Sequence, residues 1–244
     1  MLNRSLSTFM NAMTGPDYTL YPFSTCNRQD YYNLMSVYLD SVFHPLLREE
    51  DFLQEGWRLE QEELQDPDTP LVIKGVVFNE MKGAYANPQS MFGQTLLNNL
   101  YPSHTYSNSS GGFPLAIPSL TWEGLKNFHA AHYHPSNCRI LSYGNFPLAD
   151  HLAKIDAEYL DHFEALDQDT SVPLESRWSE PKRFNTTCAP DTMNPDPARQ
   201  ASVAVSYLLS DIKDLKSSFA FQVCYCTFPK TFFTSSNSRS CLNS

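Results

Sequence analysis

Two groups of residues have the types and spacing that could bind a metal ion, and the first is Glu80. A helix predicted over Leu71–Tyr85 would place this carboxylate on an apolar stripe with Ile73, Val77 and Ala84. A carboxylate on an apolar helix face is costly unless a partner balances its charge. Zinc is one such partner, because a carboxylate oxygen is a normal zinc ligand. The alternatives to zinc are an Arg or Lys partner for Glu80, or a helix rotated so that Glu80 is exposed.

The second group is His129, His132 and His134. The first two lie three residues apart, so they share one face of a helix, and the third follows at the helix end. No acidic or thiol ligand stands next to them. Packing and helix-end hydrogen bonds are therefore the commoner roles for these imidazoles, and zinc binding is the alternative.

Composition and motifs narrow the class of protein. The sequence has 27 acidic and 17 basic residues and a net charge of −10, which disfavours nucleic acid and suits a basic peptide. No apolar run approaches the ~20 residues of a membrane span. We find no nucleophile elbow, phosphate loop or dinucleotide fingerprint. Six cysteines fit neither a zinc knuckle nor a compact disulfide framework, so we expect free thiols.

The elements that must position these residues follow from periodicity. We predict a strand over Asp17–Thr25, placed at an edge by Pro22, and a strand over Arg139–Tyr143 in the same sheet. We predict one helix capped by Asn27 and closed by Pro45, a second over Asp51–Glu63 with its acidic run in solvent, and a third capped by Thr121 with Trp122, Leu125 and Phe128 on one face. A further helix would carry an amphipathic stripe of Leu148, Leu152, Ile155, Tyr159 and Phe163.

This mixture with an antiparallel flavour predicts an α+β fold. Residues 1–165 would form most of one domain, and the Pro-rich residues 166–200 would be a linker. Residues 201–223 would begin a second domain with a strand over Ala201–Leu209. Residues 224–244 change composition and read as an unrelated tail.

Several long motifs, in the same order, resemble presequence proteases, which are zinc metallopeptidases with an inverted H-x-x-E-H motif. GVVFNEMKGAY (75–85) resembles the segment that carries their third zinc ligand, and NAMTGPDYTLYPFST (11–25) resembles the strand that follows their zinc-binding helix. LTWEGLKNFHAAHYHPSNCR (120–139) and YGNFPL (143–148) match the end of their first domain. The resemblance extends from about Met1 to Val223.

The resemblance implies a pitrilysin/insulysin-like α+β domain with a mixed, mainly antiparallel sheet and packed helices. It also implies a monomeric enzyme of the mitochondrial matrix that degrades presequences and other short unstructured peptides, including amyloid-β. In such enzymes two His of H-x-x-E-H and a downstream Glu hold Zn²⁺, and Glu80 matches the downstream Glu. Asn11 and Ala12 would lie on an edge strand that captures the peptide, Asn11 would hydrogen-bond it, and Met13 would line a side-chain pocket.

One departure separates this chain from that pattern: its 244 residues contain no H-x-x-E-H. We therefore expect no catalytic residue here and no peptidase activity from the chain alone. Three interpretations remain open. The chain could be an incomplete product of an active enzyme, a noncatalytic peptide-binding module, or a structural subunit that shares the fold.

Overall fold

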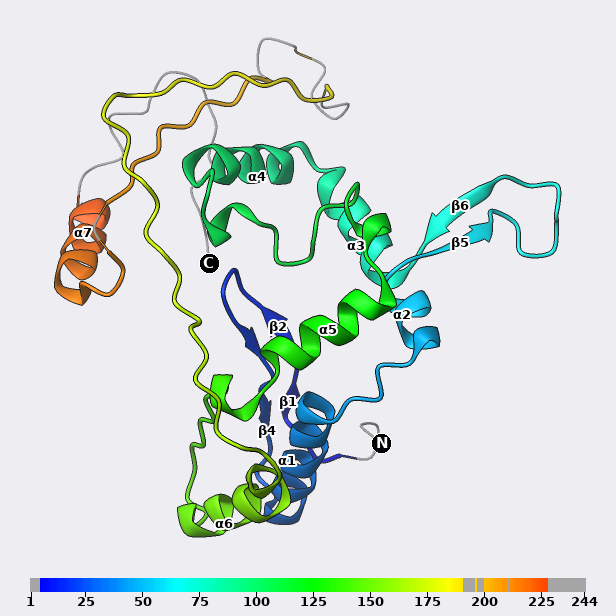
Figure 1. The fold of residues 1–244 in the computed structure, drawn as a ribbon. Coiled ribbons are helices and arrows are strands. Elements are labelled where there is room, and N and C mark those ends of the chain that lie inside the picture. Colours follow the sequence, from blue (N-terminus) through cyan, green and yellow to red (C-terminus); the bar gives the residue numbers. More distant parts are fainter. Residues whose placement is uncertain (1–4, 191–195, 197–199, 210, 228–244) are drawn as a thin grey trace. The chain divides into compact units, whose positions relative to one another are not determined.

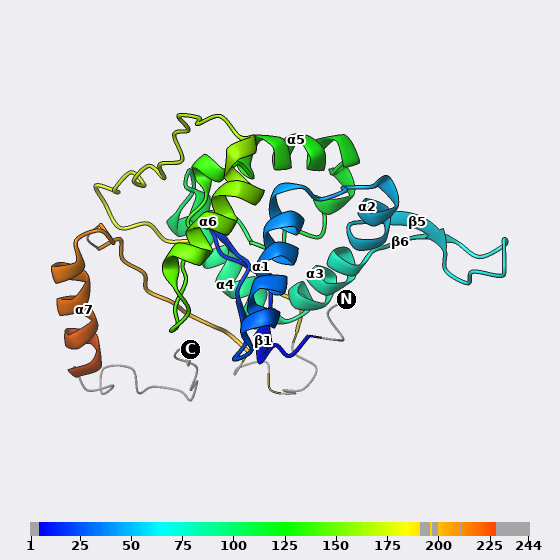
Figure 2. The same cartoon turned by 90° about the horizontal axis from the view of Figure 1, so that it is seen from below.

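The structure is a computed structural model, and it describes residues 5–190, 196, 200–209 and 211–227 (Figures 1 and 2). Of the predicted tail over 224–244, residues 228–244 lie outside this description. The chain divides into two units, Met1–Ala86 with Asn108–Val172, and Asn87–Ser107 with Pro173–Ser244. Each unit is described by itself. No helix in the described ranges is long and apolar enough to cross a membrane.

The first unit begins with a long antiparallel hairpin. It is built from β1 (Phe9–Met10), β2 (Met13–Thr14), β3 (Thr19–Leu20) and β4 (Phe23–Ser24), with β1 on β4 and β2 on β3. One register runs throughout, since Met10 faces Phe23 and Met13 faces Leu20. The predicted strand over Asp17–Thr25 is therefore two shorter strands, because Pro22 has no N–H to donate to the ladder.

Helix α1 (Arg28–Phe43) follows as predicted, and the side chain of Asn27 caps it by accepting from the Asp30 N–H. The predicted helix over Asp51–Glu63 is wrong. Helix α2 (Glu49–Glu55) ends at Gly56, and β5 (Arg58–Gln61) pairs antiparallel with β6 (Leu71–Lys74). This second hairpin projects as an arm from the rest of its unit (Figures 1 and 2). Of the acidic residues within the predicted span, Asp51, Glu55, Glu62 and Glu63 are exposed, as expected, whereas Glu60 is half-buried.

Helix α5 (Trp122–His132) begins as predicted, with the Thr121 hydroxyl accepting from the Gly124 N–H at 3.0 Å. Leu125 and Phe128 of its predicted apolar face are exposed, so the described residues do not bury that face. The inward contacts come instead from Trp122, which donates to the Leu47 carbonyl at 2.6 Å, and from His129.

Only part of the predicted stripe along α6 (Leu148–Glu158) and the residues after it is buried. Leu148 and Leu152 are exposed, whereas His151, Ile155 and Tyr159 are buried. The hydrophobic core of the described residues is small; it consists of Leu34, Met35, Phe43, Phe78, Ile117, Ile155 and Tyr159.

The predicted strand over Arg139–Tyr143 is wrong, because this stretch pairs with no strand among the described residues. It is held by side chains instead. The Ser142 hydroxyl lies 3.0 Å from the Tyr31 hydroxyl and 2.9 Å from His151 Nδ1. The stretch therefore shares no sheet with the N-terminal hairpin, contrary to the prediction.

The second unit contains α4 (Pro88–Leu100) and α7 (Leu215–Thr227). Asn87 caps α4 by accepting from the Gln89 and Ser90 N–H groups. The predicted strand over Ala201–Leu209 is wrong; this stretch pairs with no strand among the described residues, and Val203 is 90% exposed. The predicted domain boundaries at 165, 200 and 223 stay a prediction.

One carboxylate in the β5–β6 hairpin gives a test at acid pH. Glu60 accepts from Lys74 Nζ at 2.9 Å and from Arg58 Nε at 2.6 Å. These bonds, that of Lys74 first, hold the pKa of Glu60 below its ordinary value of 4.5. Because the folded pKa is lowered, the stabilisation is complete above pH 4.5 and is lost as pH falls through the folded pKa.

We expect hydrogen-exchange protection of the β5 and β6 amides to fall below pH 4.5, and Glu60→Gln to remove that pH dependence. Glu62→Gln is the matched control, because the Glu62 carbonyl and not its side chain accepts from Lys74. An unchanged acid profile in Glu60→Gln would contradict the assignment.

Candidate functional site

Glu80 lies on a helix that is shorter than predicted. The stretch Leu71–Lys74 is strand β6, and α3 (Val76–Tyr85) begins only after Gly75. The Asn79 N–H donates to the Gly75 carbonyl at 2.9 Å, which forms the first turn of the helix. The predicted helix over Leu71–Tyr85 is therefore wrong in its first five residues, because β6 is held by its ladder with β5.

The junction between β6 and α3 depends on a glycine. An added Cβ on Gly75 would lie 2.1 Å from the Gly56 carbonyl oxygen and 2.8 Å from the Trp57 Cα. Both are backbone atoms, which a rotamer change cannot move aside. Only a residue without a side chain lets the start of α3 lie this close to the turn between α2 and β5.

A second contact holds the other end of α3. The first unit resumes at Asn108, and the loop that follows packs on the helix. An added Cβ on Gly111 in this loop would lie 2.3 Å from Met81 Sδ. The rings of Tyr85 and Phe113 meet edge to face at 5.4 Å. Phe78 is buried, so α3 is anchored through Phe78, Met81 and Tyr85.

These anchors leave Glu80 on the opposite, open face of α3. Glu80, Ala84 and Val77 are all exposed. The predicted stripe is thus present on the helix but is not buried by the residues that the structure describes. Within those residues Glu80 has no ion pair and no side-chain hydrogen bond. Of the alternatives to a metal ligand, an exposed Glu80 is therefore the one that the structure shows, because Phe78 and not Glu80 lies on the core side of the helix.

Asn11, Ala12 and Met13 lie in the middle of the N-terminal hairpin, between β1 and β2 and at the start of β2. The Asn11 N–H donates to the Pro22 carbonyl at 3.1 Å, and the Gly15 N–H donates to the Tyr18 carbonyl at 2.8 Å. From Asn11 to Gly15, the odd-numbered positions therefore direct their backbone groups toward the partner strand, and before β1 the Thr8 N–H also donates to the Ser24 carbonyl at 2.8 Å. All three of the predicted peptide-binding residues are exposed.

Along an antiparallel strand, the backbone N–H and C=O groups of successive residues point alternately toward and away from the partner strand. Met10, Ala12 and Thr14 therefore direct their N–H and C=O groups away from the partner strand. No further strand pairs with this edge among the described residues. Such an edge can bind an extended chain by adding it as a strand.

Helices α1 and α5 hold the hairpin through aromatic side chains. The Tyr21 hydroxyl bonds the Tyr133 hydroxyl at 2.9 Å, and Phe23 packs on Tyr31 and Tyr38 of α1 at ring distances of 5.4 and 5.0 Å. Burial and the Tyr133 hydroxyl raise the pKa of Tyr21 far above 10. Burial also raises the pKa of Tyr38, which a hydrogen bond to the Asn11 backbone partly opposes. Both phenols therefore stay neutral at physiological pH.

The three histidines at the end of α5 have the packing and hydrogen-bonding roles that we expected to be commoner. His129 Nε2 lies 2.8 Å from the Val42 carbonyl oxygen, and its ring stacks on Tyr133. His132 packs on Phe128 at 4.4 Å. His134 Nδ1 accepts from the Ser136 N–H at 3.1 Å.

The described residues contain no group of three His, Cys, Asp or Glu side chains that could hold a metal ion. Glu80 offers a single carboxylate, and a mononuclear zinc site needs at least three protein ligands. The part of the chain that the structure describes therefore does not fit a zinc site by itself. No described hydrogen bond or ion pair joins Glu80 to residues 11–13 either.

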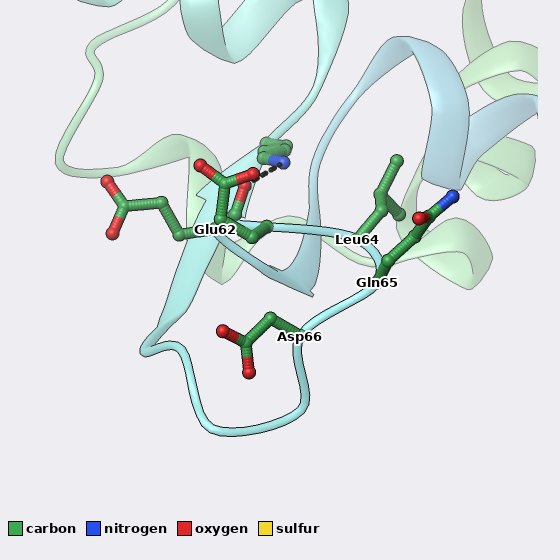
Figure 3. A pocket seen from close by; sticks show the side chains of 6 residues that line it. Glu62, Leu64, Gln65 and Asp66 are labelled. Carbon is green, nitrogen blue, oxygen red and sulfur yellow. Dashed lines mark hydrogen bonds between the residues drawn. The ribbon is translucent and has the colours of Figure 1, made fainter.

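A hollow of about 520 Å³ lies at the tip of the β5–β6 hairpin. Its lining side chains are Glu62, Glu63, Leu64, Gln65, Asp66 and Lys74. Figure 3 shows that they fan out in different directions and do not converge on one point. Lys74 is already bonded to the Glu60 carboxylate and to the Gln61 and Glu62 carbonyls. This hollow is an acidic surface without a defined ligand set.

One polar cluster was missed by sequence reasoning. His151 is 4% exposed, its Nδ1 bonds the Ser142 hydroxyl, and its Nε2 has no hydrogen-bond partner. The Tyr32 hydroxyl is likewise buried without a partner, and its ring meets His151 edge to face at 5.6 Å. The polar His151 among apolar residues of α6 was the available signal, but the stripe of leucines outweighed it.

Comparison with known proteins identifies what this chain is similar to. A family profile described as the Peptidase M16 inactive domain matches residues 119–224. The mitochondrial presequence protease of Mus musculus is 58% identical over 223 residues, which cover 91% of this chain and 22% of that protein. The relatives from Drosophila melanogaster and Saccharomyces cerevisiae are 49% and 42% identical over 224 residues, with the same coverage.

The resemblance to presequence proteases that the sequence motifs predict is thus confirmed over about nine-tenths of the chain. The chain spans about a fifth of the length of the relatives it matches. Helices with small antiparallel sheets agree with the predicted α+β class.

The close approach at Gly75 gives a stability test for the helix that carries Glu80. Gly75→Ala should destabilise the first unit by a few kcal/mol, because the new Cβ must displace backbone at Gly56. Gly83→Ala on the same helix is the matched control, since an added Cβ there meets nothing within 4 Å. It should be neutral or stabilise by about 0.5–1 kcal/mol. Chemical denaturation of the two variants measures the difference, and equal midpoints would contradict the packing argument.

Proposed function

We propose that this chain is part of a zinc metalloendopeptidase of the presequence protease type. In its complete form the enzyme would degrade mitochondrial targeting presequences and other short unstructured peptides, amyloid-β-like peptides included. The observation that carries the proposal is the 58% identity over 91% of the chain to a protein named as such a protease. By the same similarity, we assign the complete protein to the mitochondrial matrix, as a monomer with a pitrilysin/insulysin-like fold.

The part that this chain contributes is a peptide-binding edge, formed by residues Asn11, Ala12 and Met13. An exposed edge with backbone donors and acceptors binds an extended peptide largely without regard to its side chains. That property suits an enzyme whose substrates share little sequence. Targeting presequences are rich in Arg and poor in acidic residues, so they also suit a chain with a net charge of −10.

Glu80 is proposed as one zinc ligand of the complete enzyme. The support is its place in the motif at 75–85 and its position on the open face of a helix anchored from the other side. The remaining ligands and the general base would come from outside these 244 residues, in an H-x-x-E-H motif. Zinc, when bound there, would supply the polarisation of the peptide carbonyl and of a water molecule. The residues of this chain orient the peptide and contribute one carboxylate.

A noncatalytic peptide-binding or structural subunit that shares the fold is the second candidate. The observation in its favour is the match of residues 119–224 to a profile described as an inactive domain. The two candidates differ in one sequence feature: an in-frame H-x-x-E-H in the transcript upstream of Met1 would support the peptidase, and an uninterrupted transcript without that motif would support the subunit.

The zinc proposal predicts opposite results for the chain alone and for the complete enzyme. The purified chain should bind zinc only substoichiometrically and should cleave no fluorogenic peptide above background. In a chimaera, where this chain replaces the matching fifth of the mouse relative, Glu80→Gln should weaken zinc retention against a chelator. The loss should exceed the roughly 10- to 100-fold typical of groups that only orient a ligand.

Glu49→Gln on α2 is the control, because Glu49 is an exposed carboxylate outside the proposed site. Chelator-sensitive cleavage by the chain alone that Glu80→Gln abolishes would show a zinc site within these residues. His129, His132 and His134 would then be the first ligands to replace.

The edge proposal is tested by removing one outward donor. Ala12→Pro deletes the Ala12 N–H, which is not part of the hairpin ladder, and Pro is tolerated on edge strands. The variant should bind an unstructured peptide at least several-fold more weakly in a fluorescence anisotropy titration, since one net hydrogen bond is worth about 1 kcal/mol. Thr19→Pro deletes an outward donor on the other strand and should leave the affinity unchanged. Equal affinities for both variants and the parent chain would rule out docking at this edge.

A further inference from the structure

The open edge of the N-terminal hairpin lacks the usual protection. Natural proteins shield edge strands with Lys, Pro, inward-pointing charges or bulges. The segment from Phe9 to Gly15, FMNAMTG, contains no charged residue and no Pro. One contact nevertheless occupies the centre of this edge: the Ala12 N–H donates to the Asn11 side-chain oxygen Oδ1 at 2.9 Å.

We infer that the Asn11 carboxamide is a removable cap on the peptide-binding edge. The inference rests on the proposed docking of peptides at this edge and goes beyond it. A strand added in line with the hairpin must accept a hydrogen bond from the Ala12 N–H, because Ala12 is the central outward residue between Met10 and Thr14. The Asn11 Oδ1 atom holds that same hydrogen, so peptide and side chain compete for one donor.

The geometry allows the cap to open without disturbing the hairpin. Asn11 holds its place in the ladder through its backbone, since its N–H donates to the Pro22 carbonyl. Its side chain is exposed, so water can hydrate the carboxamide once it rotates away from Ala12. The cap therefore protects the edge when no peptide is present and lowers the affinity for peptides by about the strength of one exchanged hydrogen bond.

This role has the opposite sign from the one implied by the family resemblance. If Asn11 mainly hydrogen-bonds the docked peptide, its removal weakens binding. If it mainly caps Ala12, its removal strengthens binding, because the competitor is gone. A carboxylate at the same position accepts a hydrogen bond more strongly than an amide does, so Asp should cap Ala12 more firmly.

The decisive experiment compares Asn11→Ala and Asn11→Asp in the 244-residue chain. The probe is a fluorescein-labelled unstructured peptide of about 15 residues, uncharged apart from its termini. We expect Asn11→Ala to bind roughly three- to ten-fold more tightly than the parent chain, and Asn11→Asp to bind more weakly by a similar factor. Both variants retain the Asn11 backbone contact, so the hairpin should stay intact. Circular dichroism and the denaturation midpoint check this.

A second probe fixes the register. The Ala12 carbonyl needs an N–H from the peptide, and only alternate peptide residues supply one to this edge. N-methylation of one alternate set of peptide residues should abolish binding, and methylation of the other set should leave it unchanged. Loss of binding with both methylated sets would exclude a single register.

The outcomes separate this inference from the function on which it rests. Weaker or unchanged binding by Asn11→Ala, together with weaker binding by Ala12→Pro, would overturn the cap and keep the docking edge. Unchanged binding by Ala12→Pro would overturn both. Opposite shifts for the two Asn11 variants support the cap, since a purely structural role of the side chain would move both variants in the same direction.

Discussion

The contact between two backbone turns at Gly56 and Gly75 is the constraint on which the site-bearing part of the first unit depends. Gly56 ends α2, and Gly75 separates β6 from α3. The space between them has no room for a single carbon atom at Gly75. The arm of β5 and β6 leaves and returns through this point, and α3 starts from it. The direction of α3, and with it the place of Glu80, is set by backbone packing and not by a side-chain contact of Glu80 itself.

The N-terminal hairpin obeys a similar backbone rule. Pro22 has no N–H, so the ladder is interrupted beside Asn11, yet the register continues on both sides. Aromatic contacts of Tyr21 and Phe23 with α5 and α1 hold one face of the hairpin. The outer edge of its first strand pairs with no strand among the described residues, and its central donor, the Ala12 N–H, is held by the Asn11 side chain. A hairpin held in this way suits the proposed binding of extended peptides, because the ordering of the edge precedes the binding event.

Several apolar faces of the first unit remain exposed, among them Phe9, Met13 and Leu20 on the hairpin, Val76 and Val77 on α3, and Leu125 and Phe128 on α5. Exposed apolar patches of this kind mark interaction surfaces. The predicted stripes on α5 and α6 therefore describe which residues are apolar, and the described residues bury only some of them, such as Ile155 and Tyr159. Both candidate functions require a partner surface that covers these exposed faces.

The sequence by itself determined the local structure that short-range chemistry controls, and it carried the resemblance to known proteins. Asn27, Asn87 and Thr121 cap their helices because each side-chain oxygen meets N–H groups two or three residues on. The motifs around Glu80 and Asn11 predict the resemblance to presequence proteases, because they are long and ordered. Only the tertiary structure decided that Leu71–Lys74 and Arg58–Gln61 are strands, since their pairing joins residues ten to sixteen apart along the chain. It also decided that Arg139–Tyr143 is held by Ser142 and not by a ladder, and that Phe78 rather than Glu80 faces the core. Periodicity reports which faces are apolar, but burial depends on which neighbours the chain supplies to cover them.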